Sequence, residues 1–69
     1  MPSSVIGNFN YDPAHAKLTI VFTTGRVYEY YTVPAEIFDE FRKAPSKGAF
    51  FNAAIRDRYP FREITAAAG

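Results

Sequence analysis

The spacing of apolar side chains changes once along this sequence, and that change limits the folds available to it. From residue 17 to residue 31 apolar and polar side chains alternate, as around Leu18 and Ile20, which is the period of a β-strand. From residue 33 to residue 59 apolar side chains recur every three or four positions, as on one face of a helix. Strands followed by helices predict an α+β domain.

Three strands are predicted before that change. They span residues 4–11, 17–23 and 26–31. A two-residue loop between the last two strands would place an acidic side chain on the apolar face, whereas a three-residue loop ending in Gly25 avoids this. With the longer loop, Ile20 pairs with Tyr28. Leu18 then pairs with Tyr30, so the apolar and aromatic side chains share one face.

Two helices are predicted after the strands. The first begins at Pro34, because proline is favoured at the first helical position, and ends before Pro45. The second runs from about Lys47 to Arg58, with Ser46 as its N-cap. The expected fold is therefore a three-stranded antiparallel sheet, in the order β-β-β-α-α, with both helices on one face. The residues expected on its open face include Thr19, Val21, Val27, Glu29 and Tyr31.

Residues 1–69 are expected to form a single domain, with residues 4–64 as its ordered core and both ends frayed. The sequence contains no cysteine, so neither a disulfide nor a thiolate metal site can stabilise it. Its apolar stretches are far shorter than the roughly 20 residues that span a bilayer, and its first residues lack the layout of a signal peptide. We therefore expect a cytoplasmic protein with no membrane partner.

The charge is distributed unevenly along the chain. Residues 1–41 contain two basic and five acidic side chains, whereas residues 42–69 contain six basic and two acidic ones. Such an asymmetry is typical of a basic surface that faces an anionic partner. It is equally typical of a solvated helix face with no partner.

No arrangement of side chains indicates catalysis. His15, the single histidine, lies in a predicted turn three residues after Asp12, which is a weak signal for a metal site or a catalytic base. The carboxylates of the first helix lie on its solvated face, and neither a nucleophile–base set nor a phosphate loop is visible. We expect a non-catalytic protein with no cofactor and no metal site.

The start of the second helix is the main candidate for a binding site. Free amides in the first turn of a helix attract anions, and Ser46, Lys47 and Gly48 would shape that turn, add charge and permit close approach. Asn52 and Arg56 follow Gly48 at four-residue spacings, so they are expected on the same face. A phosphate or carboxylate would suit this site. The alternative is that Ser46 only caps the helix, Gly48 only allows packing and Arg56 only pairs with an acid.

Tyr28 and Tyr30 allow two interpretations. The predicted register places both rings beneath the helices, with their hydroxyls at the edge of the core, where buried tyrosines usually find partners. The same pair would also suit a stacking platform for bases, as in sheet-based RNA binders. Packing in the core is the simpler interpretation.

Short motifs occur in a fixed order along nearly the whole chain. They are Ser4-x-Ile6, Tyr11-Asp12, Leu18-x-Ile20-x-Phe22, Gly25, Tyr28-x-Tyr30, Val33-Pro34, Ala44-x-Ser46-x-Gly48, Phe50-Phe51-Asn52, Ile55-Arg56 and Tyr59. Through them the sequence resembles the KTSC domain family, a short module named after the C-terminus of some lysyl-tRNA synthetases and also found as small free-standing bacterial proteins. The attachment to a tRNA-charging enzyme implies RNA or tRNA as a partner, by association rather than by mechanism.

We therefore expect a small accessory module that binds the backbone of RNA through its basic second helix, weakly and with a strong dependence on salt. Further basic side chains would widen the charged surface: Arg42, Lys43, Arg58 and Arg62. The alternative is a protein-interaction or dimerisation module that uses the open face of the sheet. In that case Val21, Val27 and Tyr31 would make the contacts.

Overall fold

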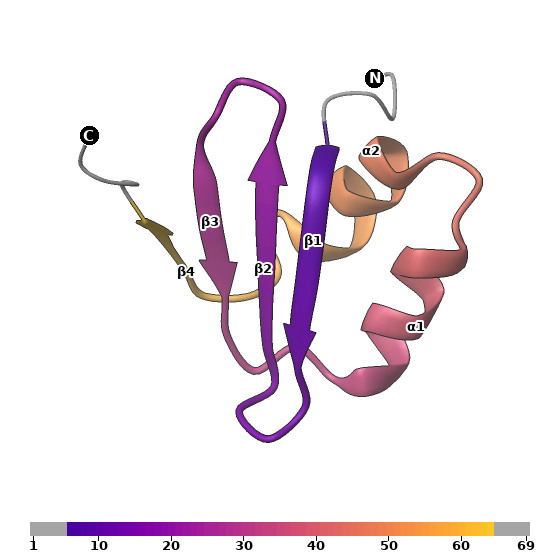
Figure 1. Ribbon diagram of the computed structural model, residues 1–69. Coiled ribbons are helices and arrows are strands. Elements are labelled where there is room, and N and C mark those ends of the chain that lie inside the picture. The colour runs from indigo at the N-terminus through magenta and orange to yellow at the C-terminus, as the bar shows by residue number, and fades with distance from the viewer. Residues whose placement is uncertain (1–5, 65–69) are drawn as a thin grey trace.

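Residues 6–64 are described by the computed structural model, and they contain a four-stranded antiparallel sheet (Figure 1). The strands are β1 (Ile6–Asp12), β2 (Lys17–Phe22), β3 (Val27–Tyr30) and β4 (Phe61–Ile64). Their order in the sheet follows the chain, β1-β2-β3-β4. The expected start of the first strand at Ser4 and the expected frayed ends lie outside the described residues.

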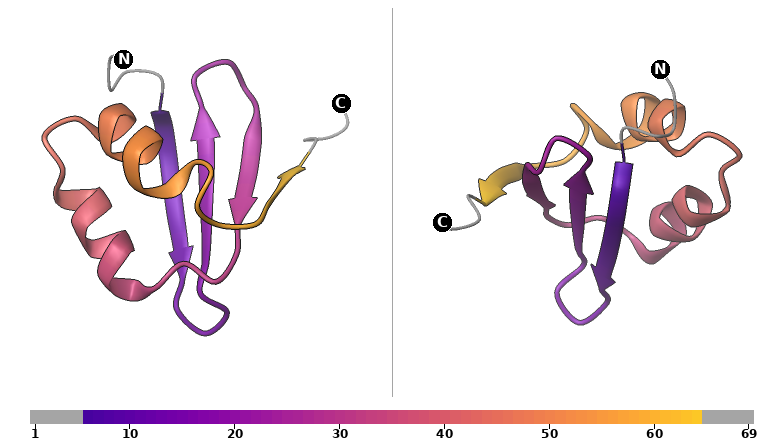
Figure 2. Two further views of the ribbon diagram at one scale, coloured as in Figure 1. Left: turned by 180° about the vertical axis from the view of Figure 1, so that it is seen from behind. Right: turned by 45° about the horizontal axis from the view of Figure 1, so that its top comes forward.

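Helices cover one face of this sheet. They are α1 (Ala35–Lys43), α2 (Lys47–Phe50) and η2 (Phe51–Ile55), a π-helix that continues α2. Figure 2 shows them on the side of β1 and β2, whereas β4 forms the opposite edge of the sheet. The predicted α+β architecture, an antiparallel sheet with helices on one face, is therefore confirmed.

The β2–β3 hairpin has the predicted register. Ile20 lies opposite Tyr28, and Leu18 lies opposite Tyr30. The backbone of Gly25 has a φ of 95°, a conformation that suits glycine, and its N–H donates to the carbonyl of a strand residue over 2.9 Å. The loop therefore directs both tyrosines to the face that the helices cover.

The prediction of a three-stranded sheet is wrong, because the chain adds β4 to the edge of β3. In this pair Tyr30 lies opposite Phe61. The N–H of Tyr31 donates to the carbonyl of Pro60 over 2.8 Å and fixes the start of the added strand. A run of four residues is too short to show a clear period, so this strand depends on the edge that the rest of the fold offers.

The second helix also differs from the single helix predicted from Lys47 to Arg58. After the four residues of α2 comes a wider π-helical turn, in which the N–H of Arg56 donates to the carbonyl of Phe51 over 2.8 Å. Phe51 and Ile55 are buried on its inner side, whereas Asn52 and Arg56 are exposed. Asn52 and Arg56 thus share the exposed side, whereas Gly48, which was predicted on the same face, is buried, and the helix changes type and ends earlier.

Seven of the described hydrophobic side chains are buried and form the core. They are Leu18, Ile20, Tyr30, Val33, Phe41, Phe51 and Ile55. The ring of Phe9, from β1, meets that of Phe41, from α1, edge to face with centroids 4.9 Å apart. The hydroxyl of Tyr11 donates to the carbonyl of Val33 over 2.6 Å and ties β1 to the segment before α1.

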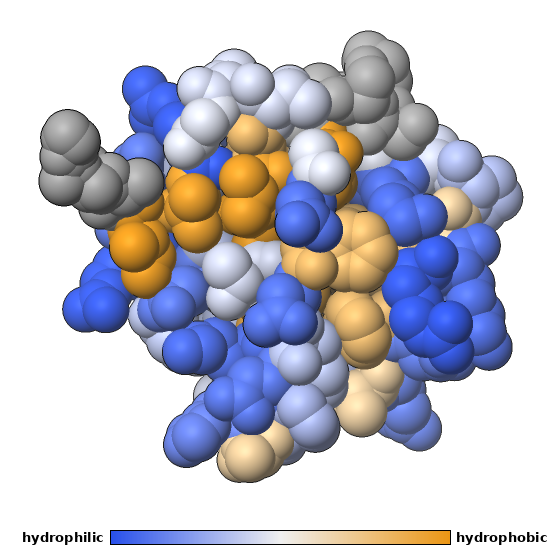
Figure 3. Space-filling model, viewed as in Figure 1, coloured by the Kyte–Doolittle hydropathy of each residue, from blue (hydrophilic) through white to orange (hydrophobic). Residues whose placement is uncertain are grey.

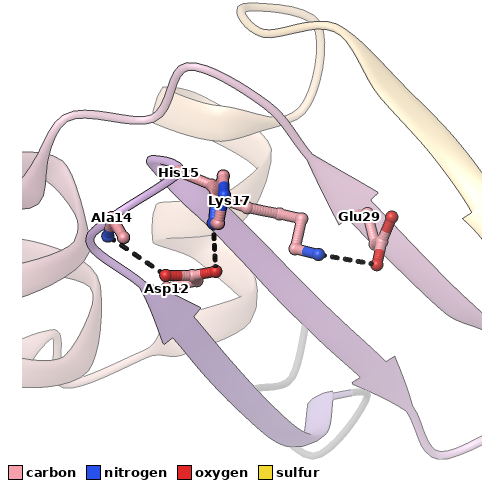
Figure 4. A network of polar contacts seen from close by, with 5 residues as sticks. All are labelled: Asp12, Ala14, His15, Lys17 and Glu29. Atoms are coloured by element: carbon pink, nitrogen blue, oxygen red, sulfur yellow. Dashed lines mark hydrogen bonds and ion pairs between the residues drawn. The ribbon is translucent and has the colours of Figure 1, made fainter.

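The turn between β1 and β2 carries the single histidine. The Asp12 carboxylate accepts a hydrogen bond from the N–H of Ala14 over 3.0 Å and pairs with Nδ1 of His15 at 2.7 Å (Figure 4). The hydrogen bond with His15 lowers the pKa of Asp12 below its usual value. Because the His15 side chain is 76% exposed, this pair belongs to a solvated turn. In the same view Lys17 pairs with Glu29 at 3.3 Å.

Candidate ligand-binding pocket

A pocket of about 400 Å³ lies where β3, β4 and the end of η2 meet. Its walls are five aromatic side chains: Phe22, Tyr28, Tyr30, Phe51 and Phe61. Its other lining residues are polar or charged: Arg26, Asn52, Arg56 and Asp57. A volume of roughly 300–1,000 Å³ and a mostly apolar lining with a few polar groups are typical of small-molecule sites.

The topology explains why this corner of the molecule is hollow. The helices lie on the side of β1 and β2, so the sheet extends past them where β4 is added (Figure 2). Phe61, the first residue of β4, is consequently 55% exposed although it faces the same side as Tyr30. The short π-helical turn closes the other side of the pocket, and such turns are frequent at functional sites.

The aromatic walls are held by contacts between their own rings. The centroid of the Phe61 ring lies 5.6 Å from that of Tyr28 and 5.5 Å from that of Tyr30. Behind them, Tyr30 meets Phe51 edge to face at 5.4 Å. These separations are within the range of about 4.5–7 Å at which aromatic pairs attract each other. Contacts between the rings therefore hold the walls of the pocket together.

The hydroxyl of Tyr30 is the buried polar group of the pocket. Tyr30 is 4% exposed, and its hydroxyl makes no hydrogen bond with any residue from 6 to 64. Since no fully buried polar side-chain atom in that range lacks a partner, the hydroxyl keeps contact with solvent through the pocket. Burial raises the pKa of Tyr30 to about 12, and the charge of Arg56 opposes the rise.

The polar side of the pocket carries two arginines, which differ in their partners. Nη1 of Arg56 donates to Oδ1 of Asn52 over 3.3 Å, so the two side chains are held together. Arg26 pairs with Glu63 at 3.7 Å. A guanidinium has five N–H donors, which leaves Arg56 donors for a ligand. Because Arg26 is already paired with Glu63, Arg56 is the lining cation whose remaining donors can meet the negative charge of a ligand.

The residues predicted at the start of the second helix have structural roles. Ser46 is the N-cap of α2 and accepts a hydrogen bond from the N–H of Ala49 over 3.3 Å. Nζ of Lys47 turns back to the carbonyl of Ala44 at 3.5 Å, and Gly48 is buried. Ser46, Lys47 and Gly48 do not line the pocket. The five residues predicted to form one anion site therefore fall into two groups: Ser46, Lys47 and Gly48 at the helix start, and Asn52 and Arg56 at the pocket.

Two predictions that were independent in the sequence meet in this pocket. Asn52 and Arg56 were predicted as part of an anion site, and Tyr28 and Tyr30 as core or stacking residues. All four line the same cavity. Tyr30 is also a core residue, whereas Tyr28 is half-buried. The structure thus brings a cation and an amide next to an aromatic wall.

Five lining residues were not predicted as site residues: Phe22, Arg26, Phe51, Asp57 and Phe61. Arg26 could have been found, because strand alternation places it on the same face as Tyr28 and Tyr30. Phe61 could not, because β4 itself was not predicted. Asp57 follows the end of η2 in a turn, which carried no sequence signal for a site.

The other basic side chains are distributed over different parts of the surface. Arg42 and Lys43 both pair with Asp39, at 2.6 and 2.9 Å. Arg62 lies opposite Glu29 in the sheet, on the face away from the helices. The positive charge next to the pocket therefore comes mainly from the arginines that line it.

The face of the sheet away from the helices carries an apolar row. Val21 lies opposite Val27, which lies opposite Ile64, so the row crosses three strands. These side chains are half-buried, and Figure 3 shows apolar side chains gathered in a band across the upper part of this face. The hydroxyl of Tyr31 donates to Glu29 over 2.7 Å. The predicted open face therefore exists and has an apolar part.

Among residues 6–64, no group of three or more histidine, cysteine, aspartate or glutamate side chains is placed to hold a metal ion. In the same part of the chain, no helix is long and apolar enough to cross a membrane.

The fold defines a class of protein: small α+β domains in which helices cover one face of an antiparallel sheet. Within that class, the chain belongs to the KTSC domain family, whose model matches residues 2–59. The resemblance seen in the sequence motifs is therefore confirmed. A crystal structure of a KTSC domain protein from Yersinia pestis is similar, with a TM-score of 0.84 and 37% identity over 93% of this chain and 90% of that one.

Related sequences occur in two contexts. A lysine–tRNA ligase of Nostoc punctiforme is 40% identical over 62 residues, which are 90% of this chain but 11% of the ligase. A protein of Tsukamurella paurometabola is 44% identical over 57 residues, 83% of this chain and 85% of that protein. The chain thus spans about one-ninth of the ligases that it matches, and most of its short relative.

Proposed function

We propose that this domain is a non-catalytic accessory module that binds single-stranded RNA, through the pocket formed by β3, β4 and η2. The observation that carries the proposal is the placement of Arg56 and Asn52 beside an aromatic wall. Guanidinium groups bind phosphates, and aromatic rings stack on bases that are not paired. Proteins that bind single strands combine these two elements.

The relatives supply a context for this proposal. Lysine–tRNA ligases act on tRNA, as their name states, and a domain of this kind forms part of them. An accessory module with weak affinity for RNA would raise the local concentration of tRNA near such an enzyme. For the present chain we propose the same class of partner, RNA with unpaired segments such as those of tRNA.

The proposal is tested by fluorescence anisotropy of a labelled single-stranded RNA of twelve nucleotides, titrated with the full chain at two salt concentrations. We expect weak binding at low salt and a clear loss of affinity at higher salt, since cations on the RNA are released upon binding. Arg56→Ala should weaken binding and reduce the dependence on log salt concentration by roughly 0.7, the contribution of one phosphate contact on a single strand.

Arg42→Ala is the matched control. It removes the same charge from an exposed position, but Arg42 pairs with Asp39 on α1 and does not line the pocket. We expect its affinity to be close to that of the unchanged chain. No binding at low salt would contradict the proposal, and so would an equal loss of affinity in both variants.

A second candidate function is favoured by the apolar row on the outer face. Val21, Val27 and Ile64 lie side by side on neighbouring strands with no helix over them (Figures 1 and 3). Rows of this kind are common in protein interfaces. Sedimentation over a range of concentrations distinguishes the two functions: a dimer that persists at high salt and is lost in Val27→Lys favours a protein-interaction module.

A further inference from the structure

We infer that the pocket holds a single unpaired nucleotide, with its base against Phe61 and Tyr28 and its phosphate at Arg56. This inference rests on the proposed function and specifies which part of the RNA enters the pocket. It limits the contents of the pocket to one base and its phosphate. The reasons are the exposure of Phe61, the hydrogen-bonding groups of the lining and the unused hydroxyl of Tyr30.

Phe61 is exposed in a way that a core residue would not be. Its side chain is 55% exposed, unlike the other large hydrophobic side chains among residues 6–64. The centroids of the Tyr28 and Tyr30 rings nevertheless lie within 5.6 Å of its own. Part of this aromatic cluster, at the pocket, therefore remains exposed. A planar base that stacks there would bury apolar surface that the chain alone leaves in water.

The groups around this wall match the edge of a base and the charge of a phosphate. Asn52 offers an amide and Asp57 a carboxylate, which are the types of side chain that pair with base edges. Arg56 is hydrogen-bonded to Asn52 at 3.3 Å and has further N–H donors for a phosphate. A base and its phosphate therefore find complementary groups within one cavity of about 400 Å³.

The hydroxyl of Tyr30 is an independent sign of a ligand. Tyr30 is more than nine-tenths buried, it lines the pocket, and its hydroxyl has no hydrogen-bond partner among residues 6–64. A phenylalanine would fill the same space without a polar group to hydrate. The hydroxyl is explained if it donates to, or accepts from, a group that enters the cavity.

The charge of the lining favours a nucleotide over an aromatic side chain of a protein. Arg56 makes no ion pair with any residue from 6 to 64, and a neutral ring would leave its charge without a partner. A nucleotide carries the negative charge and the ring in one unit. Because a base within a duplex is stacked and paired, the nucleotide must come from a single-stranded segment.

The first test compares uridine 5′-monophosphate with ribose 5-phosphate, which has the same phosphate and no base. The probe is the change in NMR chemical shifts of the full, isotopically labelled chain. We expect the nucleotide to shift signals of Asn52, Arg56 and Phe61 and to bind at least about fivefold more tightly than ribose 5-phosphate. Equal binding of the two compounds would overturn the inference.

The second test uses two variants of the aromatic wall and the labelled RNA of twelve nucleotides. Phe61→Ala should weaken RNA binding roughly fivefold or more without changing the salt dependence, since no phosphate contact is lost. Tyr30→Phe keeps the ring and should weaken binding about two- to tenfold. Tyr31→Ala removes an aromatic side chain from the opposite face and serves as the matched control, with affinity unchanged.

The outcomes separate this inference from the proposed function. If RNA binds in a salt-dependent way but Phe61→Ala and Tyr31→Ala behave alike, the RNA contacts only the surface and the nucleotide pocket is wrong. If a phenylalanine-containing dipeptide shifts the pocket signals and the nucleotide does not, the pocket serves a protein partner and the inference is again wrong. If no RNA binds at low salt, the proposed function fails as well.

Discussion

Tyr30 is a core residue that also lines the pocket, and these two roles make different demands on its side chain. Its ring is part of the core, in edge-to-face contact with Phe51, and its hydroxyl has no partner among residues 6–64. The hydroxyl meets water only through the pocket and gains no partner from the fold in return, which lowers stability. The residue is therefore better suited to binding than to stability. The raised pKa of Tyr30 makes this conflict measurable.

Tyr30→Phe should change how stability depends on pH. The unfolded chain releases the tyrosine proton near pH 10, whereas the folded chain holds it up to a pKa of about 12. Between these values the folded state binds more protons, so its stability falls as the pH rises. The test is urea unfolding of both chains at about pH 9 and pH 11.5. Between these pH values the free energy of unfolding of the unchanged chain should fall by on the order of 2 kcal/mol more than that of Tyr30→Phe. Equal losses in both chains would show that the Tyr30 proton is not held by the fold.

At the level of elements, the helix start and the π-helical turn have separate tasks. Ser46 caps α2 through the N–H of Ala49, whereas Asn52 and Arg56 extend from the following turn to the pocket. The helix start and the pair Asn52 and Arg56 come from one stretch of sequence, which a single regular helix was predicted to hold. The wider turn is what separates them.

Ser46→Ala tests this division of tasks. Loss of an N-cap side chain destabilises a protein by about 1 kcal/mol, and we expect a loss of that size in urea unfolding. RNA affinity should remain within twofold of that of the unchanged chain at a temperature where both are folded. If the affinity falls as far as in Arg56→Ala, the start of α2 is part of the binding site and the pocket alone does not account for it.

The elements also differ in how far the sequence could predict them. The β2–β3 hairpin was predictable in register, because alternation and the positive φ of Gly25 are local properties. β4 was not, since its pairing of Phe61 with Tyr30 joins residues far apart in the chain. The π-helical turn was not predictable either, because the spacing of Phe51 and Ile55 suits a regular helix equally well.

The same distinction explains how much of the pocket was predictable. Tyr28, Tyr30, Asn52 and Arg56 were chosen for their residue types and local spacing, and they line one cavity. That they share it follows from the packing of η2 against the β3–β4 edge. Phe61 closes the cavity only because β4 pairs with β3, so no local signal identified it.

For the whole molecule, the small core limits how many apolar residues can be left exposed for ligand binding, because each of them contributes less to stability. A chain of 69 residues is expected to have a free energy of unfolding of roughly 3–10 kcal/mol. Phe41 has no exposed surface and Phe61 is 55% exposed, so the two phenylalanines differ greatly in their contribution to the free energy of unfolding. The core lies under α1 and α2, and the pocket lies at the edge of the sheet.

Phe41→Ala should therefore mainly lower stability, whereas Phe61→Ala should mainly lower RNA affinity. Phe41→Ala should remove about 3–5 kcal/mol, most of the stability of the domain, and leave it partly or wholly unfolded in circular dichroism. Phe61→Ala should cost about 1 kcal/mol or less and leave the fold intact. A large loss of stability in Phe61→Ala would mean that this ring belongs to the core and is not kept for a ligand.

The most direct measurement is a map of the RNA contact on the full chain, from NMR chemical shifts at low salt with a single-stranded RNA of twelve nucleotides. The largest changes are expected at Arg26, Asn52, Arg56 and Phe61, which surround the pocket. They should diminish together as salt is added. Changes confined to the apolar row at Val21 and Val27, or none at any RNA concentration, would contradict an RNA-binding pocket at the edge of the sheet.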